Sequence, residues 1–448
     1  MRRLVYIAFV VGTLCCALRT PVAAQDYERL SESSTLGTAR YMGMAGAMTA
    51  VGADPSAAID NPAGLGFYRR SEVLFSIGGH FDRAWQDGTN NYGRARRASL
   101  PQASIVLAFG EHYANNTCYQ NAIMFSYRRT HDYSRRLTLM DIDQPSLGDL
   151  LNEYQIKRGI AYPTERTNIG YRQDIWESGA AHEYAFDWGM SINHRWYVGL
   201  GLHVQSYMLA SDGLYYEQFA TLNADSANHD IENKTGLTLN GVGCKLAVGL
   251  IYRPAQWARV GVSLHTPSLG SVSTYTSGVF SALTDTLRYS YAPDGRRSAQ
   301  DFHMPLRLSV GAAFTLGNFG MLSLQYDYRH NFYSDDLHAL RGGLEISPVE
   351  GLYLNAGYAW ETTFRTSNRR VDIDPEFKRQ DTYYCHHLSS QYASAGIGYR
   401  GKHFMIQAAY QYRWQTYHYN AHQNADTQLL RTDTHRFVIT LGWHRSNP

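Results

Sequence analysis

The chain has 448 residues, of which 44 % are hydrophobic, 18 % charged and 13 % aromatic, and its formal net charge is +2. This aromatic content excludes intrinsic disorder, and after residue 24 no stretch approaches the roughly 18 apolar residues of a membrane-spanning helix. The near-neutral charge gives no reason to expect nucleic-acid binding. Together with 34 tyrosines and 39 glycines, these values favour a β protein, either soluble or a membrane barrel.

Residues 1–24 have the layout of a secretory signal peptide. A basic start (1–3) precedes an apolar stretch (4–18), and small residues at 22–24 mark a cleavage site before Gln25. A membrane anchor would need a longer apolar run. After cleavage three widely spaced cysteines remain, which predict neither a disulfide framework nor a zinc site: Cys118, Cys244 and Cys385. We therefore expect an exported protein without metal or cofactor.

Residues 25–70 differ from the rest of the chain. Between 37 and 66 roughly half of the positions are Gly or Ala, which allows close backbone approach. Asp54 followed by Pro55 predicts a helix start, and the Asn-Pro-Ala-Gly-Leu sequence at 61–65 predicts its end. This compact segment is the candidate for a plug inside a barrel.

From residue 71 onward, apolar and polar or small residues alternate with the period of β-strands. In 184–192, for example, Tyr, Phe, Trp, Met and Ile occupy every second position. Each predicted strand is near the 9–11 residues that cross an outer membrane at a tilt. The predicted strands are 73–81, 103–110, 121–129, 183–193, 196–208, 237–252, 258–265, 305–316, 320–331, 337–347, 351–361, 391–400, 403–415 and 435–445.

The connections between these strands alternate between short turns and long segments. This alternation is typical of outer-membrane barrels, which have short periplasmic turns and long external loops, whereas a soluble sandwich has no reason for it. The expected fold is all-β, an antiparallel transmembrane β-barrel of about 14 strands with an N-terminal lumenal hatch. The last strand is one that barrel-assembly machinery would read. The barrel would span 71–448, and the expected long external loops are 82–102, 130–182, 209–236, 266–304, 362–390 and 416–434.

One face of each predicted strand is apolar and should contact lipid, so the other face should line the lumen. Lumenal arginines have two interpretations: they bind a carboxylate head group, or they pair with lumenal acids in a structural network. The expected lumenal polar residues are Asp187, Lys245, Arg307, Gln325, Asp327, Arg329, Arg341, Glu345, Gln407, Gln411 and Arg413.

Residues 37–47, 54–57 and 61–65 resemble the amino-terminal hatch of the FadL/TodX family of outer-membrane transporters of hydrophobic compounds, most closely its branch in Bacteroidetes-type bacteria. The resemblance implies a hatch that blocks the lumen and shifts when a lipophilic ligand binds, and a ligand that leaves sideways at a strand kink. The Gly241/Gly243 region is one candidate for that kink. The residues to which the resemblance assigns hatch or gating roles are Gly43, Gly46, Asp54, Asn61, Pro62, Ala63, Gly64 and Leu65.

Two groups in the expected external loops carry alternative interpretations. Four residues at helical spacing, Leu147, Leu150, Leu151 and Tyr154, would form either a capture groove for an apolar ligand or a helix packed on neighbouring loops. The second group could ligate haem iron or a metal, or consist of solvated loop histidines: His386, His387, His418 and His422.

The sequence contains no Gly-x-Ser-x-Gly elbow, His-Glu-x-x-His motif or phosphate-binding glycine loop, so we do not expect an enzyme. The leading hypothesis is uptake of small hydrophobic molecules resembling long-chain fatty acids across the outer membrane of a Gram-negative cell. One alternative is a shuttle of type IX secretion that binds proteins through its loops, and another is haem capture. Outer-membrane lipid and the barrel-assembly machinery are the other expected partners.

Overall fold

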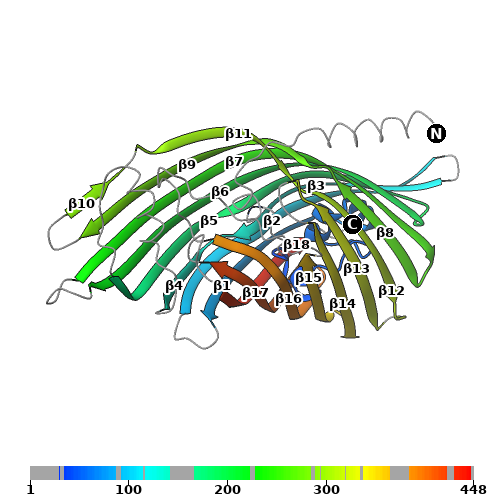
Figure 1. Cartoon of the computed structure of the whole chain (residues 1–448). Coiled ribbons are helices and arrows are strands. Elements are labelled where there is room, and N and C mark those ends of the chain that lie inside the picture. The colour runs from blue at the N-terminus through cyan, green and yellow to red at the C-terminus, as the bar shows by residue number, and fades with distance from the viewer. Residues whose placement is uncertain are drawn as a thin grey trace.

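The computed structural model describes residues 30, 35–86, 92–114, 117–141, 166–221, 228–283, 288–292, 294–317, 319–332, 336–363, 383–420 and 428–444. Its strands form one antiparallel sheet that closes on itself (Figure 1), because β1 pairs with β18 from Glu72↔His444 to Gln86↔Leu430. The strands are β1 (Glu72–Gln86), β2 (Tyr92–Ala114), β3 (Thr117–Asp132), β4 (Arg135–Asp141), β5 (Arg166–Ile192), β6 (Trp196–Thr221), β7 (Asn228–Ala255), β8 (Ala258–His265), β9 (Ser268–Leu283), β10 (Arg288–Tyr291), β11 (Arg296–Met304), β12 (Leu306–Thr315), β13 (Gly320–His330), β14 (Leu337–Val349), β15 (Leu352–Thr363), β16 (Tyr383–Arg400), β17 (Phe404–Asn420) and β18 (Gln428–His444).

The 18 strand segments make a barrel of fourteen strands, as the sequence predicts. β3 and β4 are two parts of one barrel strand, as are β8 and β9, and β10, β11 and β12 together form another. Pro267 and Pro305 account for two of the interruptions, since proline has no backbone N–H for the ladder. Near Gly241 and Gly243, the kink candidate, β7 itself is continuous, and its partner changes from β9 to β8 between Cys244 and Ala247.

The barrel has apolar side chains on its outer face and polar side chains inside, the reverse of a soluble protein. On β13, Leu324 is 53 % exposed on the outer face, whereas its inward neighbours Gln325 and Asp327 are buried. The same alternation occurs on β1, where Ile77 is exposed and Ser76 is buried. An apolar outer surface and a polar interior are the distribution of a transmembrane barrel. Within the described ranges, no helix has the length and apolar character needed to cross a membrane.

The segments expected as long loops consist largely of strand in their described parts, and this expectation was wrong. Residues 209–221 continue β6 and 228–236 begin β7, while β9, β10 and β11 lie between 268 and 304. Figure 1 shows β5, β6 and β7 extending past the shorter β12–β15. Pairing continues there without an apolar outer face, as at the polar pair Gln218↔Asp230, whose residues are not buried. Hydrophobic alternation therefore underestimates strand length beyond the lipid.

The expected loop residues have different outcomes. His386, His387 and His418 belong to β16 and β17 rather than to loops, although their side chains lie outside the described set. His422 and residues 147–154 lie outside the described residues altogether.

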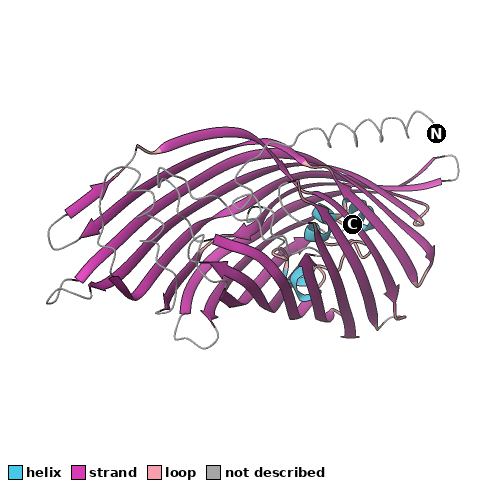
Figure 2. Cartoon of the chain, viewed as in Figure 1, coloured by secondary structure: helices cyan, strands magenta, loops and turns pink. Residues whose placement is uncertain are grey.

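Residues 35–68, which we call the inner segment, lie within the barrel (Figure 2). They contain α3 (Ala39–Gly43), α4 (Pro55–Asp60) and the 3-10 helix η1 (Pro62–Phe67). α4 begins as predicted, with Asp54 as its N-cap and Pro55 at the first helical position, and it ends before Asn61. No residue of the inner segment is exposed. The segment thus fills part of the space that the barrel wall leaves open.

Candidate functional site in the barrel lumen

The inner segment contacts the wall along a row of glycines. Gly189, Gly199 and Gly249 are register neighbours on β5, β6 and β7. A Cβ added at Gly199 would lie 2.2 Å from the carbonyl carbon of Pro62, and one at Gly249 would lie 1.9 Å from Asn61 Oδ1. Larger residues would therefore collide with the Asn-Pro-Ala motif, so the wall and the motif fit each other as surfaces.

The motif also holds its own conformation. Asn61 caps η1, since its Oδ1 accepts from the Ala63 N–H at 3.2 Å, and its Nδ2 donates to the Thr49 carbonyl at 2.7 Å. Leu65 is fully buried in a cluster with Ala58 and Ile59 of α4. These contacts connect η1 to the rest of the inner segment, so that the segment forms one packed unit.

The other expected hatch residues lie in the same unit. The Asp54 carboxylate accepts from the Ser56 N–H at 2.9 Å. The Gly43 carbonyl accepts from Ser394 Oγ of the wall at 3.0 Å, and a Cβ at Gly46 would lie 2.6 Å from Arg341 Nη1. The remaining two, Ala63 and Gly64, are buried.

A bidentate ion pair joins α3 to the wall. Arg40 Nε lies 2.6 Å from one carboxylate oxygen of Glu345, and its Nη2 lies 2.8 Å from the other. Burial disfavours the charged guanidinium, but Glu345 outweighs burial and raises the pKa of Arg40. The expected lumenal residue Glu345 is therefore an anchor for the inner segment.

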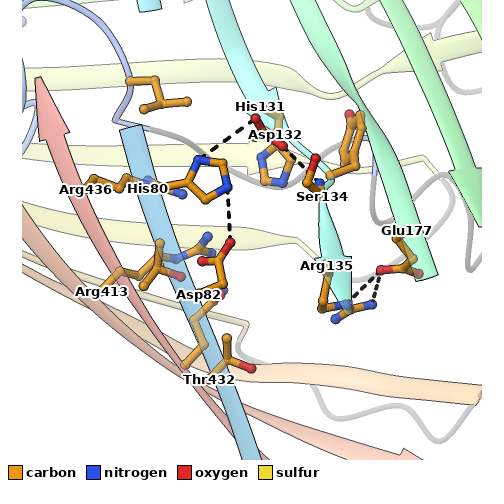
Figure 3. Close-up of a pocket in the computed structure, with 14 residues that line it drawn as sticks. His80, Asp82, His131, Asp132, Ser134, Arg135, Glu177, Arg413, Thr432 and Arg436 are labelled. Atoms are coloured by element: carbon orange, nitrogen blue, oxygen red, sulfur yellow. Dashed lines mark hydrogen bonds and ion pairs between the residues drawn. The ribbon is translucent and has the colours of Figure 1, made fainter. Parts of the chain in front are cut away.

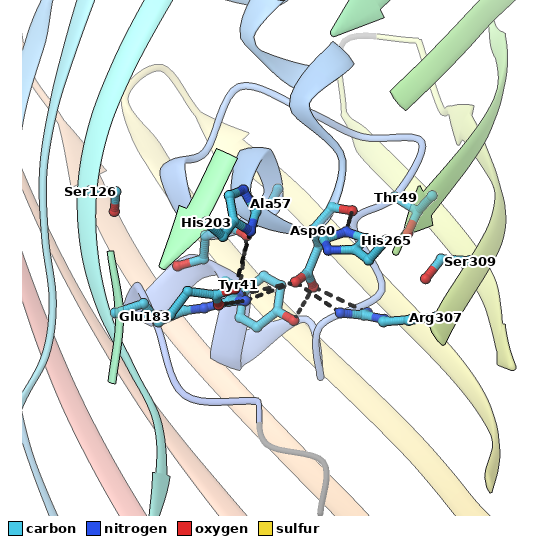
Figure 4. A network of polar contacts seen from close by, with 12 residues as sticks. Tyr41, Thr49, Ala57, Asp60, Ser126, Glu183, His203, His265, Arg307 and Ser309 are labelled. Carbon is cyan, nitrogen blue, oxygen red and sulfur yellow. Dashed lines mark hydrogen bonds and ion pairs between the residues drawn. The ribbon is translucent and has the colours of Figure 1, made fainter. Parts of the chain in front are cut away.

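Asp60, at the end of α4, connects the inner segment to several side chains of the wall (Figure 4). The Tyr41 hydroxyl donates to its Oδ2 at 2.5 Å, and Arg128 Nη1 and Arg307 Nη1 lie 3.1 and 3.0 Å from its Oδ1. His265 Nε2 lies 2.8 Å from its carbonyl oxygen. Burial alone would raise the pKa of Asp60, but the Arg307 and Arg128 guanidiniums hold it well below its ordinary value. Asp60 is thus a buried carboxylate that stays ionised.

The charge network continues away from Asp60 on both sides. Arg307 Nη2 lies 3.2 Å from Asp327 Oδ1, and Arg341 Nε lies 2.9 Å from Asp327 Oδ2. On the other side Arg128 contacts Glu183 at 3.0 Å, and Glu183 also contacts Lys245 at 2.7 Å. These pairs agree with the structural-network interpretation of the lumenal arginines.

Three further expected lumenal residues have other partners. Arg329 lies 3.5 Å from Glu361, and Asp187 lies 2.9 Å from His203, which also lies 3.1 Å from Glu183. Arg413 donates to Ser390 at 2.8 Å and stacks over the ring of Tyr392.

The sequence analysis did not single out Asp60, Arg128 or Glu183, which are central to the network. Arg128 and Glu183 do lie inside predicted strands at inward positions. Asp60 directly precedes the Asn-Pro-Ala motif, which was the available signal.

Next to Asp60 lies a cavity of about 100 Å³ whose lining is both apolar and charged. Its apolar lining residues are Leu30, Leu36, Tyr207, Met304 and Pro305. Its charged or titratable lining residues include Asp60, Arg128, Glu183, Lys245, His265, Arg307 and Arg329. A cavity of this kind suits the junction between an apolar chain and an anionic head.

A second cavity, of about 70 Å³, adjoins the first and shares Leu36 and His131 with it (Figure 3). Its lining is mostly polar. His80 Nε2 lies 3.2 Å from Asp82 Oδ2, and Arg135 Nε donates to Glu177 at 2.7 Å. Arg413 and Arg436 also line this cavity, which is therefore strongly polar.

These observations define a class of protein, a closed transmembrane β-barrel whose lumen holds a buried N-terminal segment beside two small cavities. No family model and no curated protein matches the chain. Its structure is similar to a FadL homologue of Pseudomonas aeruginosa (12 % identity, TM-score 0.55) and to the toluene transporters TodX of Pseudomonas putida (12 %, 0.52) and TbuX of Ralstonia pickettii (12 %, 0.51). Each alignment covers 92 % of this chain and 99 % of the other. The chain has the FadL/TodX-family fold.

Proposed function

We propose that this protein is an outer-membrane channel for the uptake of small hydrophobic molecules, with the inner segment as its hatch. The observation that carries the proposal is that the buried inner segment contacts the wall on several sides of the lumen, with α3 against β15–β18, α4 against β2, β3 and β5, and η1 against β5–β7. We infer that a solute crossing the lumen would have to displace this segment. The similar solved structures include two named as toluene transporters, which supports the same substrate class.

The layout of the barrel supports a direction of passage. Short turns such as 193–195, 256–257 and 401–403 lie at one end, which we assign to the periplasm, and the long β5–β7 extensions lie at the outside. The glycine row on which η1 rests lies near the short turns, whereas Glu183 and Glu177 of the cavities lie further along β5. A solute from outside would therefore reach the cavities before the hatch.

The mixed lining of the cavity favours a substrate with an apolar body and an anionic head, such as a fatty acid, over a pure hydrocarbon. The cationic groups would neutralise the head, and Leu36, Tyr207 and Met304 would contact the apolar chain. Residues 1–24 as a signal peptide, residues 147–154 as a capture site and membership of the Bacteroidetes-type branch stay predictions.

Mass spectrometry of molecules that co-purify with the native protein in mild detergent tests this proposal. We expect a stoichiometric lipophile with an ionisable head, and its loss in Met304→Trp, which places a larger side chain at an apolar lining position of the cavity. His303→Trp, at the neighbouring position on the other face of β11, should keep it. An empty lumen with a tightly held protein partner would contradict uptake and favour the secretion-shuttle alternative.

A further inference from the structure

A bulge near the end of β2 turns a carboxylate into the barrel mouth. The β2–β3 register shifts between Ala108 and Glu111, and Gly110 in the bulge has a φ of +77°. The extra residue places Glu111 opposite Gln120, which faces inward. Cys118 lies on the same inward face of β3, two residues before Gln120. The bulge thus puts Glu111 and Cys118 on one face of the hairpin.

The β5–β6 turn adds a histidine to this pair. Asn193 and His194 both have positive φ, at 50° and 52°. Asn193 fixes the turn to β3, since its Oδ1 accepts from the Cys118 N–H at 2.8 Å and its N–H donates to the Cys118 carbonyl at 2.8 Å. The imidazole of His194 is therefore held next to the Cys118 thiol by contacts of Asn193 with the Cys118 backbone, which use neither the imidazole nor the thiol.

The three side chains have the separations of metal ligands. Cys118 Sγ lies 3.7 Å from His194 Nε2, which lies 3.5 Å from Glu111 Oε1. All three atoms lie within 4.8 Å of one another. Tetrahedral zinc with bonds of about 2.3 Å to sulfur and about 2.0–2.2 Å to nitrogen and oxygen has ligand separations of about 3.3–3.6 Å. The observed spacing needs adjustments of only tenths of an ångström in the two measured pairs.

We propose that Glu111, Cys118 and His194 form a zinc site at the short-turn end of the barrel, with a fourth position open to water. A thiolate, a neutral imidazole and a carboxylate balance the charge of Zn²⁺, and this donor set disfavours magnesium and calcium. The thiol is buried, whereas the His194 and Glu111 side chains are 34 % and 35 % exposed, which leaves an entry path.

The site ties the β2–β3 hairpin to the β5–β6 turn. It also lies beside the junction of the inner segment and β1, because Arg69 Nε is 4.0 Å from Glu111 Oε1. Bound zinc would take over the neutralisation of Glu111 from Arg69. The site is independent of the proposed transport activity. It also revises the expectation from cysteine spacing, since Cys118 and His194 are 76 positions apart in the chain.

Titration of the metal-free, reduced full-length protein in detergent with Co²⁺ tests the site. We expect one equivalent to produce a thiolate-to-cobalt charge-transfer band that Zn²⁺ abolishes by displacement. Cys118→Ser should lose the band, and His194→Ala and Glu111→Gln should each weaken binding at least about tenfold. Cys244→Ser is the matched control and should behave as wild type, because that cysteine lies exposed on β7.

Heat-modifiable migration on gels would establish that each variant barrel is folded. In the same preparations, Zn²⁺ should slow maleimide labelling at Cys118 at least about tenfold and leave Cys244 unaffected. The site does not exist if the wild type gives no charge-transfer band with a free thiol at Cys118, if the band persists in Cys118→Ser, or if zinc changes labelling of both cysteines equally.

Discussion

Replacing Asp60 by asparagine is expected to release the inner segment while the barrel stays closed. The change leaves Arg128 and Arg307 buried without their shared carboxylate, which costs about 3–5 kcal/mol. The cost falls on the docked state of the inner segment, because a displaced segment takes Asp60 away from both arginines. The population of displaced segment should therefore rise by about two to four orders of magnitude.

Trypsin cleavage after Arg40 measures this release. The Arg40 side chain is 13 % exposed and paired to Glu345, so cleavage there requires the segment to open. We expect cleavage about 150 to 5000 times faster in Asp60→Asn. The matched control Asp301→Asn removes an exposed carboxylate of β11 and should have no effect. A rate within twofold of wild type in Asp60→Asn would show that Asp60 is not an anchor.

The same anchor gives a pH dependence with a defined sign. Since the folded-state pKa of Asp60 lies well below its ordinary value of about 3.9, its stabilisation is complete above that pH and is lost as the pH falls through the lowered pKa. Pepsin should thus cleave the wild-type inner segment only in strong acid, whereas Asp60→Asn should be cleaved over the whole range from about pH 2 to 5.

Replacing Gly199 by valine should displace η1 from the wall. The new Cβ would lie 2.2 Å from the Pro62 carbonyl carbon and 2.4 Å from the Ala63 nitrogen. β6 is paired on both sides, with Gly189 and Gly249 at this level, so the inner segment has to move. Overpacking of this kind costs about 1–3 kcal/mol, which predicts cleavage after Arg40 about 5 to 150 times faster.

Gly342→Val is the matched control for this substitution. The nearest atom to a Cβ at Gly342 is Leu324 Cδ2, at 3.7 Å, which is ordinary contact. Both variants should fold into barrels. Equal tryptic cleavage after Arg40 in the two variants would mean that the glycine row does not support η1.

The barrel could be predicted from sequence because each of its strands is encoded by a local alternation of apolar and polar residues. Leu324, Gln325 and Asp327 each take the face that the period of two assigns to them, and the lipid makes that pattern strong. The extensions of the strands beyond the lipid could not be predicted from this alternation. Outside the lipid a strand such as β7 continues by backbone pairing alone, and its residues 228–236 have no reason to alternate.

The lumen could be predicted only in part, because its contacts join distant residues. The helix start at Asp54 and Pro55 is encoded locally and was found. Arg128 and Arg307 lie 68 and 247 positions from Asp60, so no sequence pattern connects them. The Asn-Pro-Ala motif indicated the region but not the glycine row that receives it.

A reversible tether between the inner segment and the wall tests the hatch most directly. A Cβ at Gly311 lies 3.3 Å from Thr49 Cβ, close to the separation of about 3.5–4.5 Å in disulfides. Thr49→Cys with Gly311→Cys, in a background in which Cys118, Cys244 and Cys385 are serine, would join the segment to β12. Fatty-acid uptake into vesicles is then measured before and after reduction, with Thr49→Cys alone as the control. We expect uptake to be blocked when the pair is oxidised and restored by reductant. Equal uptake in the oxidised and reduced forms would contradict passage through a displaced inner segment.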